Sequence, residues 1–337
     1  MKRILVTGGL GFIGSHTVVE LQSSGFEVVI IDDLSNSKIE VLDSITEITG
    51  TKPNFHQIDL RIKSDVQKFF ESNSIDGIIH FAAFKAVGES VNKPLEYYEN
   101  NIGSLVYLLQ EMRDKNIDNF IFSSSCTVYG QADELPITEN APTKPAESPY
   151  GNTKQIGEEI IKENCLANNK NAIALRYFNP IGAHDSIKIG ELPLGIPQNL
   201  IPYVTQTAAG IREQLSVFGD DYNTPDGTAI RDYIHVVDLA KAHIAALQRL
   251  LEKRNKTNFE FFNVGTGTGS SVLEVVKAFE NSTGKKLNYK IVDRRAGDIT
   301  AAYADTTIAN KELNWKTEKS LDEALLSSWK WQEKQNS

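Results

Sequence analysis

Arg3-Ile-Leu-Val-Thr7-Gly8-Gly-Leu-Gly11-Phe-Ile-Gly14 is the stretch that decides the fold of this chain. A short β-branched run leads into spaced glycines, and a pattern of helical period follows from Ser15 to Ser24. Glycine allows the backbone amides at a helix N-terminus to approach a pyrophosphate. The order of strand, glycine turn and helix therefore predicts a dinucleotide site at Gly8, Gly11 and Gly14.

An acidic pair strengthens this interpretation. The next β-rich run, Glu27 to Ile31, ends in Asp32-Asp33, about 20 residues after the glycines. A carboxylate at this position can accept hydrogen bonds from both hydroxyls of an adenosine ribose. The alternative is a glycine-rich turn with an exposed acidic corner, but the combined context favours the dinucleotide site.

The alternation of strand and helix continues along the first half of the chain. Strands are expected over Asn54–Ile58, Gly77–Ala82, Asn119–Ser123 and Asn171–Arg176, with segments of helical period between them. This pattern predicts an α/β fold with a Rossmann-type, doubly wound parallel sheet. Ligands bind beyond the carboxyl ends of such strands. The expected walls of the site are therefore Asp59, the segment Phe81 to Lys85, Ser123 to Ser125, and Tyr177 to Asn179.

The local composition of the sequence changes after Asn179, where proline and glycine become frequent. We expect a dinucleotide-binding domain over 1–179 and a smaller, mixed α/β substrate domain over 180–337. The second domain is expected to be discontinuous, because the helical stretch Val236–Arg254 and the β-rich run Phe259–Val264 could return to the main sheet. Gly265-Thr-Gly-Thr-Gly269 resembles a second nucleotide loop, but no acidic second strand follows it, and Ser270-Ser271 suit a helix N-cap.

Composition excludes several functional classes. The chain has 337 residues, 40% of them hydrophobic, and a formal net charge of −9, with no basic stripe that could bind nucleic acid. Its two cysteines, Cys126 and Cys165, lack the spacing of a zinc site or a disulfide framework. No apolar run is long enough to span a membrane. We expect a cytoplasmic protein with no metal site and no membrane partner.

Tyr150-Gly-Asn-Thr-Lys154 follows Ser148-Pro149, which places a phenol and an ammonium four residues apart on one face of an expected helix. Lowering the pKa of the phenol from about 10 to about 7 requires roughly 4 kcal/mol. One cation at about 5 Å supplies roughly 3 kcal/mol, and a second could supply the remainder. Taken alone, the pair is more often the start of an ordinary amphipathic helix.

Several further motifs carry a resemblance that covers nearly the whole chain. The chain closely resembles the extended short-chain dehydrogenase/reductase family, and within it the members that epimerise nucleotide sugars at C4. The motifs are Thr7 to Gly14, His80 to Ser90, Ser123 to Gly130, Tyr150 to Lys154, Arg176 to His184, Arg231 to His235 and Arg294 to Asp298. The resemblance implies interconversion of UDP-galactose and UDP-glucose by oxidation at C4, rotation of the 4-keto sugar and re-reduction.

The resemblance also assigns roles. Tyr150 would be the base, Lys154 would lower the pKa of Tyr150 and bind the nicotinamide ribose, and Ser125 would bind the sugar 4-oxygen. A homodimer is implied, through helices near Leu95–Arg113 and Gly151–Asn168. The NAD site would add Phe12, Ile13, Asp32, Asp33, Asn36, Ser37, Asp59, Leu60, Phe81, Ala82, Ala83, Lys85, Asn100 and Phe178 to the glycines and the three catalytic residues. The UDP-hexose site would comprise Lys85, Ser125, Tyr150, Asn179, Asn199, Leu200, Val217, Phe218, Arg231, Arg295, Asp298 and Ala302.

Plainer readings of these residues stay open. Arg231 and Arg295 could form surface salt bridges, Asn179 could be a turn residue, and Ser125 could end a strand. The histidines of the motifs, which we expect to make structural hydrogen bonds, are His80, His184 and His235.

Ala302 bears on specificity. Relatives restricted to UDP-glucose carry a tyrosine at this position, so an alanine leaves room for the acetamido group of UDP-GalNAc and UDP-GlcNAc. The nearest rival activity is that of a sugar-nucleotide 4,6-dehydratase, which needs an acidic pair where this chain has Cys126-Thr127. A dehydrogenase that releases NADH and a non-catalytic NAD-sensing regulator are further alternatives, and the regulator would typically have lost the tyrosine or the lysine.

Overall fold

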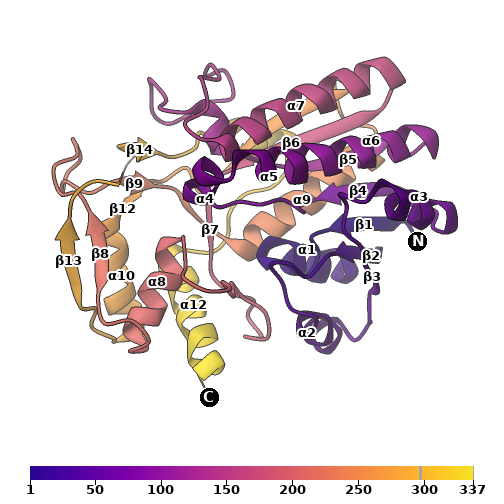
Figure 1. Ribbon diagram of the computed structural model, residues 1–337. Helices are drawn as coiled ribbons and strands as arrows, with labels where there is room; N and C mark the ends of the chain where they lie inside the picture. Colours follow the sequence, from indigo (N-terminus) through magenta and orange to yellow (C-terminus); the bar gives the residue numbers. More distant parts are fainter. Residues whose placement is uncertain (296–297, 337) are drawn as a thin grey trace.

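The computed structural model describes residues 1–295 and 298–336. Its centre is a seven-stranded sheet of order β11-β6-β5-β4-β1-β2-β3, in which every neighbouring pair is parallel (Figure 1). This is the doubly wound sheet that the alternating sequence predicts. The strands are β1 (Arg3–Thr7), β2 (Glu27–Asp32), β3 (Asn54–Gln57), β4 (Gly77–His80), β5 (Asn119–Ser125), β6 (Asn171–Tyr177) and β11 (Phe259–Val264).

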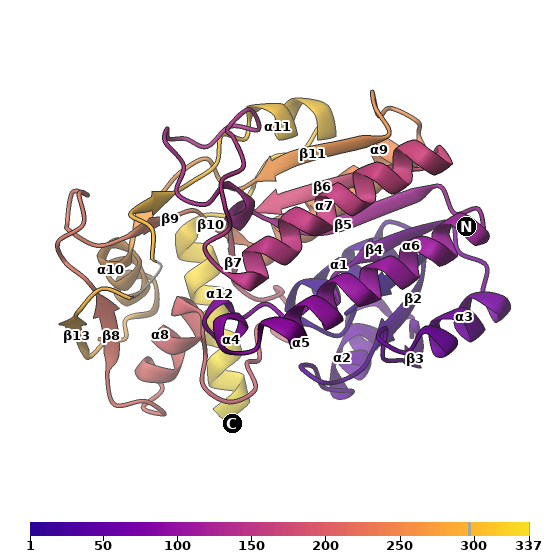
Figure 2. The same cartoon turned by 45° about the horizontal axis from the view of Figure 1, so that its top comes forward.

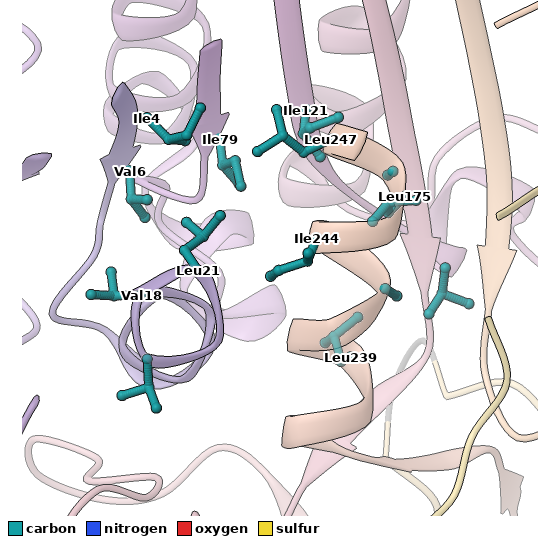
Figure 3. Packing of buried hydrophobic residues seen from close by; sticks show 14 of the residues in the cluster. Ile4, Val6, Val18, Leu21, Ile79, Ile121, Leu175, Leu239, Ile244 and Leu247 are labelled. Carbon is teal, nitrogen blue, oxygen red and sulfur yellow. The ribbon is translucent and has the colours of Figure 1, made fainter. Parts of the chain in front are cut away.

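Helices cover both faces of the sheet, because successive side chains of each strand point to opposite faces. Ile4 and Val6 of β1 pack into one hydrophobic core, and Leu5 between them packs into the other. The first core lies under α1 (Phe12–Ser23), α2 (Glu40–Thr49), α9 (Val236–Leu251) and α11 (Thr307–Leu313), and Figure 3 shows α1 and α9 meeting over it. The second lies under α3 (Lys63–Ser72), α6 (Ser104–Asp114) and α7 (Pro149–Asn168); Figure 2 shows α6 and α7 side by side across this face.

A smaller unit lies beyond the carboxyl ends of the main strands (Figure 1). Its hydrophobic core gathers residues of three helices and short strands, among them Val204, Val275, Phe279, Leu325 and Trp329. The helices are α8 (Leu200–Ala208), α10 (Val272–Thr283) and α12 (Leu321–Asn336). The strands form three small sheets, which are β7 (Asn179–Ile181) with β10 (Tyr233–His235), β12 (Ser270–Ser271) with β9 (Ile230–Arg231) and β14 (Ala301–Ala302), and β8 (Leu215–Phe218) with β13 (Tyr289–Val292).

Two segments after residue 180 return to the first unit, where one adds a strand to the main sheet and both add helices that pack on it. As the sequence suggests, β11 pairs with β6 and α9 packs against α1. The structure adds α11, whose Ala309 and Leu313 enter the first core, although the sequence-based boundary placed them with the second domain. We propose two domains that divide near Asn179, with 236–264 and 307–315 returning to the first.

The helical segment near Leu95–Arg113, which was expected to contribute to a dimer interface, contains an irregular turn. The structure has the short helices α4 (Val87–Asn92) and α5 (Pro94–Tyr98), then a π-helical turn, η1 (Glu99–Gly103), and then α6. Single π turns inside α-helices often occur at functional sites. Here the turn directs Asn101 inward, where it binds the backbone amide of Phe84 at 2.8 Å and Thr153 of α7 at 3.0 Å. The turn thereby ties the loop after β4 to α7, the helix that carries Tyr150.

No helix in residues 1–295 and 298–336 is long and apolar enough to cross a membrane.

Candidate active site at the carboxyl edge of the sheet

The glycine turn after β1 closes tightly on the loop that follows β4. Gly8 has a positive φ of 68°, and a Cβ there would lie 2.8 Å from the backbone nitrogen of Ala82. A Cβ at Gly14 would lie 2.1 Å from the carbonyl oxygen of Gly8. Both positions therefore require glycine. Helix α1 begins at Phe12, three residues before the predicted start, so the amides of Phe12 and Ile13 lie in its first turn, and both residues line the cavity described below.

Asp32 is the last residue of β2 and is buried. Its Oδ2 accepts a hydrogen bond from the amide of Leu10 at 3.1 Å, and its Oδ1 accepts from the amide of Leu34 at 3.0 Å and from Ser37 Oγ at 2.7 Å. Burial raises the pKa of this carboxyl, and the bonds from Ser37, Leu34 and Leu10 oppose the rise. Oδ2 retains a lone pair for a further donor.

Tyr150 and Lys154 lie in the first turns of α7, as their spacing predicts. Ser148 caps the helix by accepting a bond from the amide of Gly151 at 3.1 Å, and Pro149 is its first residue. The ammonium of Lys154 lies 5.7 Å from the centre of the Tyr150 ring and donates a 2.7 Å bond to the carbonyl oxygen of Ser123. Ser125 ends the neighbouring strand β5. Two elements therefore bring the three predicted catalytic side chains to one edge of the sheet.

Burial controls the titration of this pair. It raises the pKa of Tyr150 to about 12, and a hydrogen bond with Ser125 opposes the rise. It lowers the pKa of Lys154 to about 8, and the charge of Glu158 opposes that fall. An ordinary phenol has a pKa of about 10, so burial adds about 3 kcal/mol to the cost of forming the phenolate. The ammonium at 5.7 Å offsets roughly that amount, and further stabilisation has to come from other charges.

One cavity of about 2240 Å³ extends from the glycine turn past Tyr150 to Arg231. Pockets for a single small ligand are roughly 300–1,000 Å³, so this one has room for two ligands side by side. All the residues predicted to bind cofactor or substrate line it, except Val217. The side chain of Val217 is fully buried in the core of the second unit, because alternate residues of β8 point inward. Its neighbours Ser216 and Phe218 line the cavity instead.

Carboxylates hold several of the groups expected to bind the UDP-sugar. Arg231 forms an ion pair with Asp298. Lys85 Nζ lies 3.4 Å from Glu191, whose Oε1 also accepts a 2.8 Å bond from Asn199. The Arg294 to Asp298 motif is described only in part, because Ala296 and Gly297 lie outside the described residues. Ala302 is buried in β14, whose pairing with β9 sets it beside Arg231.

Some residues of the site carry too little sequence signal to be found in advance. Glu191 lies in the proline- and glycine-rich segment, where an acidic residue suggests only a solvated loop. Asn101 binds through an irregular turn that no periodicity indicates. Tyr177, by contrast, belongs to the wall predicted at Tyr177 to Asn179, and it hydrogen bonds to Ser123 and lines the cavity.

The second glycine run has a packing role, as expected. A Cβ at Gly265 would lie 2.4 Å from Oδ2 of the buried Asp232, and that carboxylate accepts bonds from the amides of Thr266 at 2.8 Å and Gly267 at 3.1 Å. Ser271 caps α10 in a capping box with Glu274. The loop is therefore bound to the protein's own carboxylate.

Comparisons with known proteins agree with this arrangement. A family model described as GDP-mannose 4,6 dehydratase matches residues 5–327. The UDP-glucose 4-epimerase of Bacillus subtilis (strain 168) is 52% identical, over 98% of this chain and 96% of its own length. That of Drosophila melanogaster is 50% identical with the same coverage.

Solved structures superpose closely on the whole chain. The UDP-glucose-4-epimerase of Stenotrophomonas maltophila, with bound NAD and formylated UDP-arabinopyranose, is 46% identical with a TM-score of 0.96, covering 100% of this chain and 99% of its own. The enzyme from Bifidobacterium longum, in complex with NAD+ and UDP, is 47% identical with a TM-score of 0.95, covering 99% of each chain. The chain belongs to the extended short-chain dehydrogenase/reductase family and, within it, to the UDP-glucose 4-epimerases.

Proposed function

We propose that the protein interconverts UDP-galactose and UDP-glucose with NAD as a recycled cofactor. The observation that carries this function is the placement of Tyr150, Lys154 and Ser125 in one cavity, between the glycine turn and Arg231. The reaction has no net redox change, because the hydride removed from C4 of the sugar returns to the other face of the same carbon.

The residues of the first unit fit NAD. The first turn of α1 offers backbone amides for a pyrophosphate, and Asp32 offers an acceptor for ribose hydroxyls at the end of β2. Asp33, Asn36, Asp59 and Asn100 line the same part of the cavity. When bound, NAD+ supplies a hydride acceptor and one positive charge, which is the second cation that the phenolate of Tyr150 requires.

The protein's own groups move one proton. The phenolate of Tyr150 accepts the proton of the sugar 4-hydroxyl while Ser125 hydrogen bonds to the same oxygen. Lys154 stabilises the phenolate through its charge. In the return step Tyr150 gives the proton back to the 4-oxygen. Rotation of the 4-keto sugar between the two steps inverts the configuration at C4.

The second unit offers groups suited to a UDP-sugar. Arg231 and Arg295 can bind diphosphate oxygens through two parallel hydrogen bonds. Arg295 lies against the first unit, because a Cβ built on Gly88 would be in van der Waals contact with its Nη2, at 3.9 Å. Asn179, Asn199 and Phe218 extend this wall. An acidic protein can hold a doubly charged anion in this way.

The rival 4,6-dehydratase activity needs a carboxylic acid beside the catalytic hydroxyl to expel water. The residue after Ser125 is Cys126, and burial raises the pKa of its thiol to about 12. Such a thiol does not replace the missing acid, so the site favours epimerisation. The match to a dehydratase family model reflects the shared scaffold, because fold and cofactor loop are common to both activities.

We further propose that UDP-N-acetylhexosamines are substrates. Ala302 lines the cavity, and its side chain ends at a single methyl group. A tyrosine at this position would fill space that an acetamido group needs.

A homodimer through α5, α6 and α7 remains our proposal, supported by the exposure of Leu95 and Leu166 on these helices. The sedimentation coefficient of the protein tests it. The proposed cytoplasmic location is supported by the two free cysteines.

The decisive experiment is incubation of purified protein with UDP-galactose and no added cofactor. UDP-glucose should form without stoichiometric release of NADH. Accumulation of a 4-keto-6-deoxy sugar would establish a dehydratase instead, and release of NADH in step with product would establish a dehydrogenase.

A further inference from the structure

A buried ion pair lies directly under the catalytic helix. Glu158 is one turn beyond Lys154 on α7, and its Oε1 accepts bonds from Arg176 Nε at 2.9 Å and from Ser124 Oγ at 2.5 Å. Arg176 Nη2 binds the other carboxylate oxygen, and both side chains are less than a tenth exposed. Replacing a buried pair by apolar residues is often neutral or stabilising, so such a pair is weak evidence for stability alone. Its position suggests a task at the active site.

Glu158 also connects α7 to β5 in register with the catalytic groups, whereas its partner Arg176 lies on the next strand, β6. Lys154 donates to the carbonyl oxygen of Ser123, Glu158 accepts from the side chain of Ser124, and Ser125 is the next residue along the strand. Two successive turns of the helix are therefore bound to two successive residues of the strand. This attachment sets the distance between Tyr150 at the start of α7 and Ser125 at the end of β5.

Glu158 is also the anion nearest to Lys154 on its own helix, since residues four apart share a helix face. The other titratable or charged groups around Lys154 are Tyr150 on α7, His80 on β4, and Tyr177 and Arg176 on β6. Burial lowers the pKa of His80 to about 3 and raises those of the two tyrosines, so all three are neutral near pH 7 in the protein alone. Glu158 is thus the negative charge that faces the ammonium.

We propose that Glu158 is a positioning residue for the reaction: its carboxylate, held by Ser124 and Arg176, fixes α7 on β5 and keeps the ammonium of Lys154 charged. The inference rests on the proposed function, because the charge of Lys154 matters through the phenolate of Tyr150. Removal of the carboxylate takes away a negative charge and leaves the positive charge of Arg176 without its carboxylate partner. Both changes disfavour the charged form of Lys154.

The test is Glu158→Gln, which preserves the size of the side chain and one acceptor oxygen but removes the charge. Carbon-13 NMR of lysine side chains, with Lys154 assigned by comparison with Lys154→Arg, reports the titration of Lys154 without any turnover. We expect its pKa to fall by roughly one unit. In steady-state assays, the alkaline limb of kcat should move to lower pH by the same amount, with the KM for UDP-galactose little changed. Glu158→Asp should restore most of the alkaline limb.

Two further variants control for folding. Glu260→Gln breaks a comparable buried pair with Arg249, whose Nε lies 2.7 Å from Glu260, and should leave the Lys154 titration and the kcat profile unchanged. If Glu158→Gln does not fold, the double variant Glu158→Gln/Arg176→Met removes both charges and should show a smaller shift in the same direction.

The outcomes separate the two claims. An unchanged Lys154 titration in Glu158→Gln, or a kcat that falls equally at every pH, would make Glu158 purely structural and overturn the proposal. Failure of the unmodified protein to epimerise UDP-galactose at any pH would overturn the proposed function instead, while the NMR titration would still decide the role of Glu158.

Discussion

Lys154→Met removes the ammonium beside Tyr150 while it keeps an unbranched side chain. The ammonium lies 5.7 Å from the centre of the phenol ring. At an effective dielectric constant of about 20, the interaction of two unit charges at this distance is worth about 3 kcal/mol. The pKa of Tyr150 should therefore rise by about two units, and kcat near pH 7 should fall roughly a hundredfold, because the phenolate is the base in the proposed mechanism.

The way in which the loss of kcat in Lys154→Met depends on pH is a more specific test than its size. Above the pKa of Tyr150 in the unmodified protein, kcat no longer gains from further ionisation, whereas in Lys154→Met it still rises about tenfold per pH unit. The difference between the two proteins should therefore shrink as pH rises. Initial rates of UDP-glucose formation at saturating UDP-galactose, from roughly pH 6 to pH 9, measure it. Bound NAD has to be quantified in each preparation, because the family resemblance also assigns Lys154 to the cofactor.

A matched control is available next to the same helix. Lys170 is a buried lysine just beyond the C-terminus of α7, and its ammonium lies 2.8 Å from Asp118, outside the cavity. Lys170→Met should lower the free energy of unfolding and leave the pH profile of kcat unchanged. A deficit in Lys154→Met that is the same at every pH, with fold and NAD content retained, would refute the electrostatic role of Lys154.

Three further outcomes are expected. Tyr150→Phe should lower kcat by about 10²- to 10⁴-fold while NAD and UDP bind as before, and loss of binding in calorimetry would mean that Tyr150 is structural. Ala302→Tyr should remove turnover of UDP-N-acetylgalactosamine selectively, and an unchanged ratio of the two activities would reject the size argument. Burial lowers the pKa of His243 from 6.5 to about 4. Between these pH values the unfolded chain is protonated at His243 and the folded protein is not, so the free energy of unfolding decreases as pH falls. His243→Phe should therefore reduce the slope of unfolding free energy against pH by up to about 1.4 kcal/mol per unit between roughly pH 6.5 and 4, measured by urea denaturation.

Local features of this chain could be predicted from sequence because their causes are local. Helix geometry alone places Tyr150 and Lys154 on one face, and Pro149 with Ser148 fixes where that helix begins. The spacing of Gly8, Gly11 and Gly14 likewise predicts the turn. The boundaries of the predicted strands differ by a few residues from those observed; β5, for example, continues to Ser125.

Features that depend on packing between distant segments could not be predicted. The sequence does not show that burial raises the pKa of Tyr150 to about 12, because the groups that cover it come from other elements. Val217 was assigned to the substrate by resemblance, but the inward face of β8 is decided by the core of the second unit. The pairing of Glu158 with Arg176 joins a helix to a strand, and neither residue alone indicates the other.

The order of strands in the main sheet has a consequence for biosynthesis. Strand β6 ends at Tyr177, but its partner β11 begins only at Phe259, after the first strands and α8 of the second unit have been made. During translation the backbone groups of β6 therefore remain an open sheet edge until the ribosome has released Val264. Unpaired edges of nascent chains are sites of aggregation. Protection of this edge by chaperones should matter for the yield of the protein, and slowed translation before Phe259 should lower it.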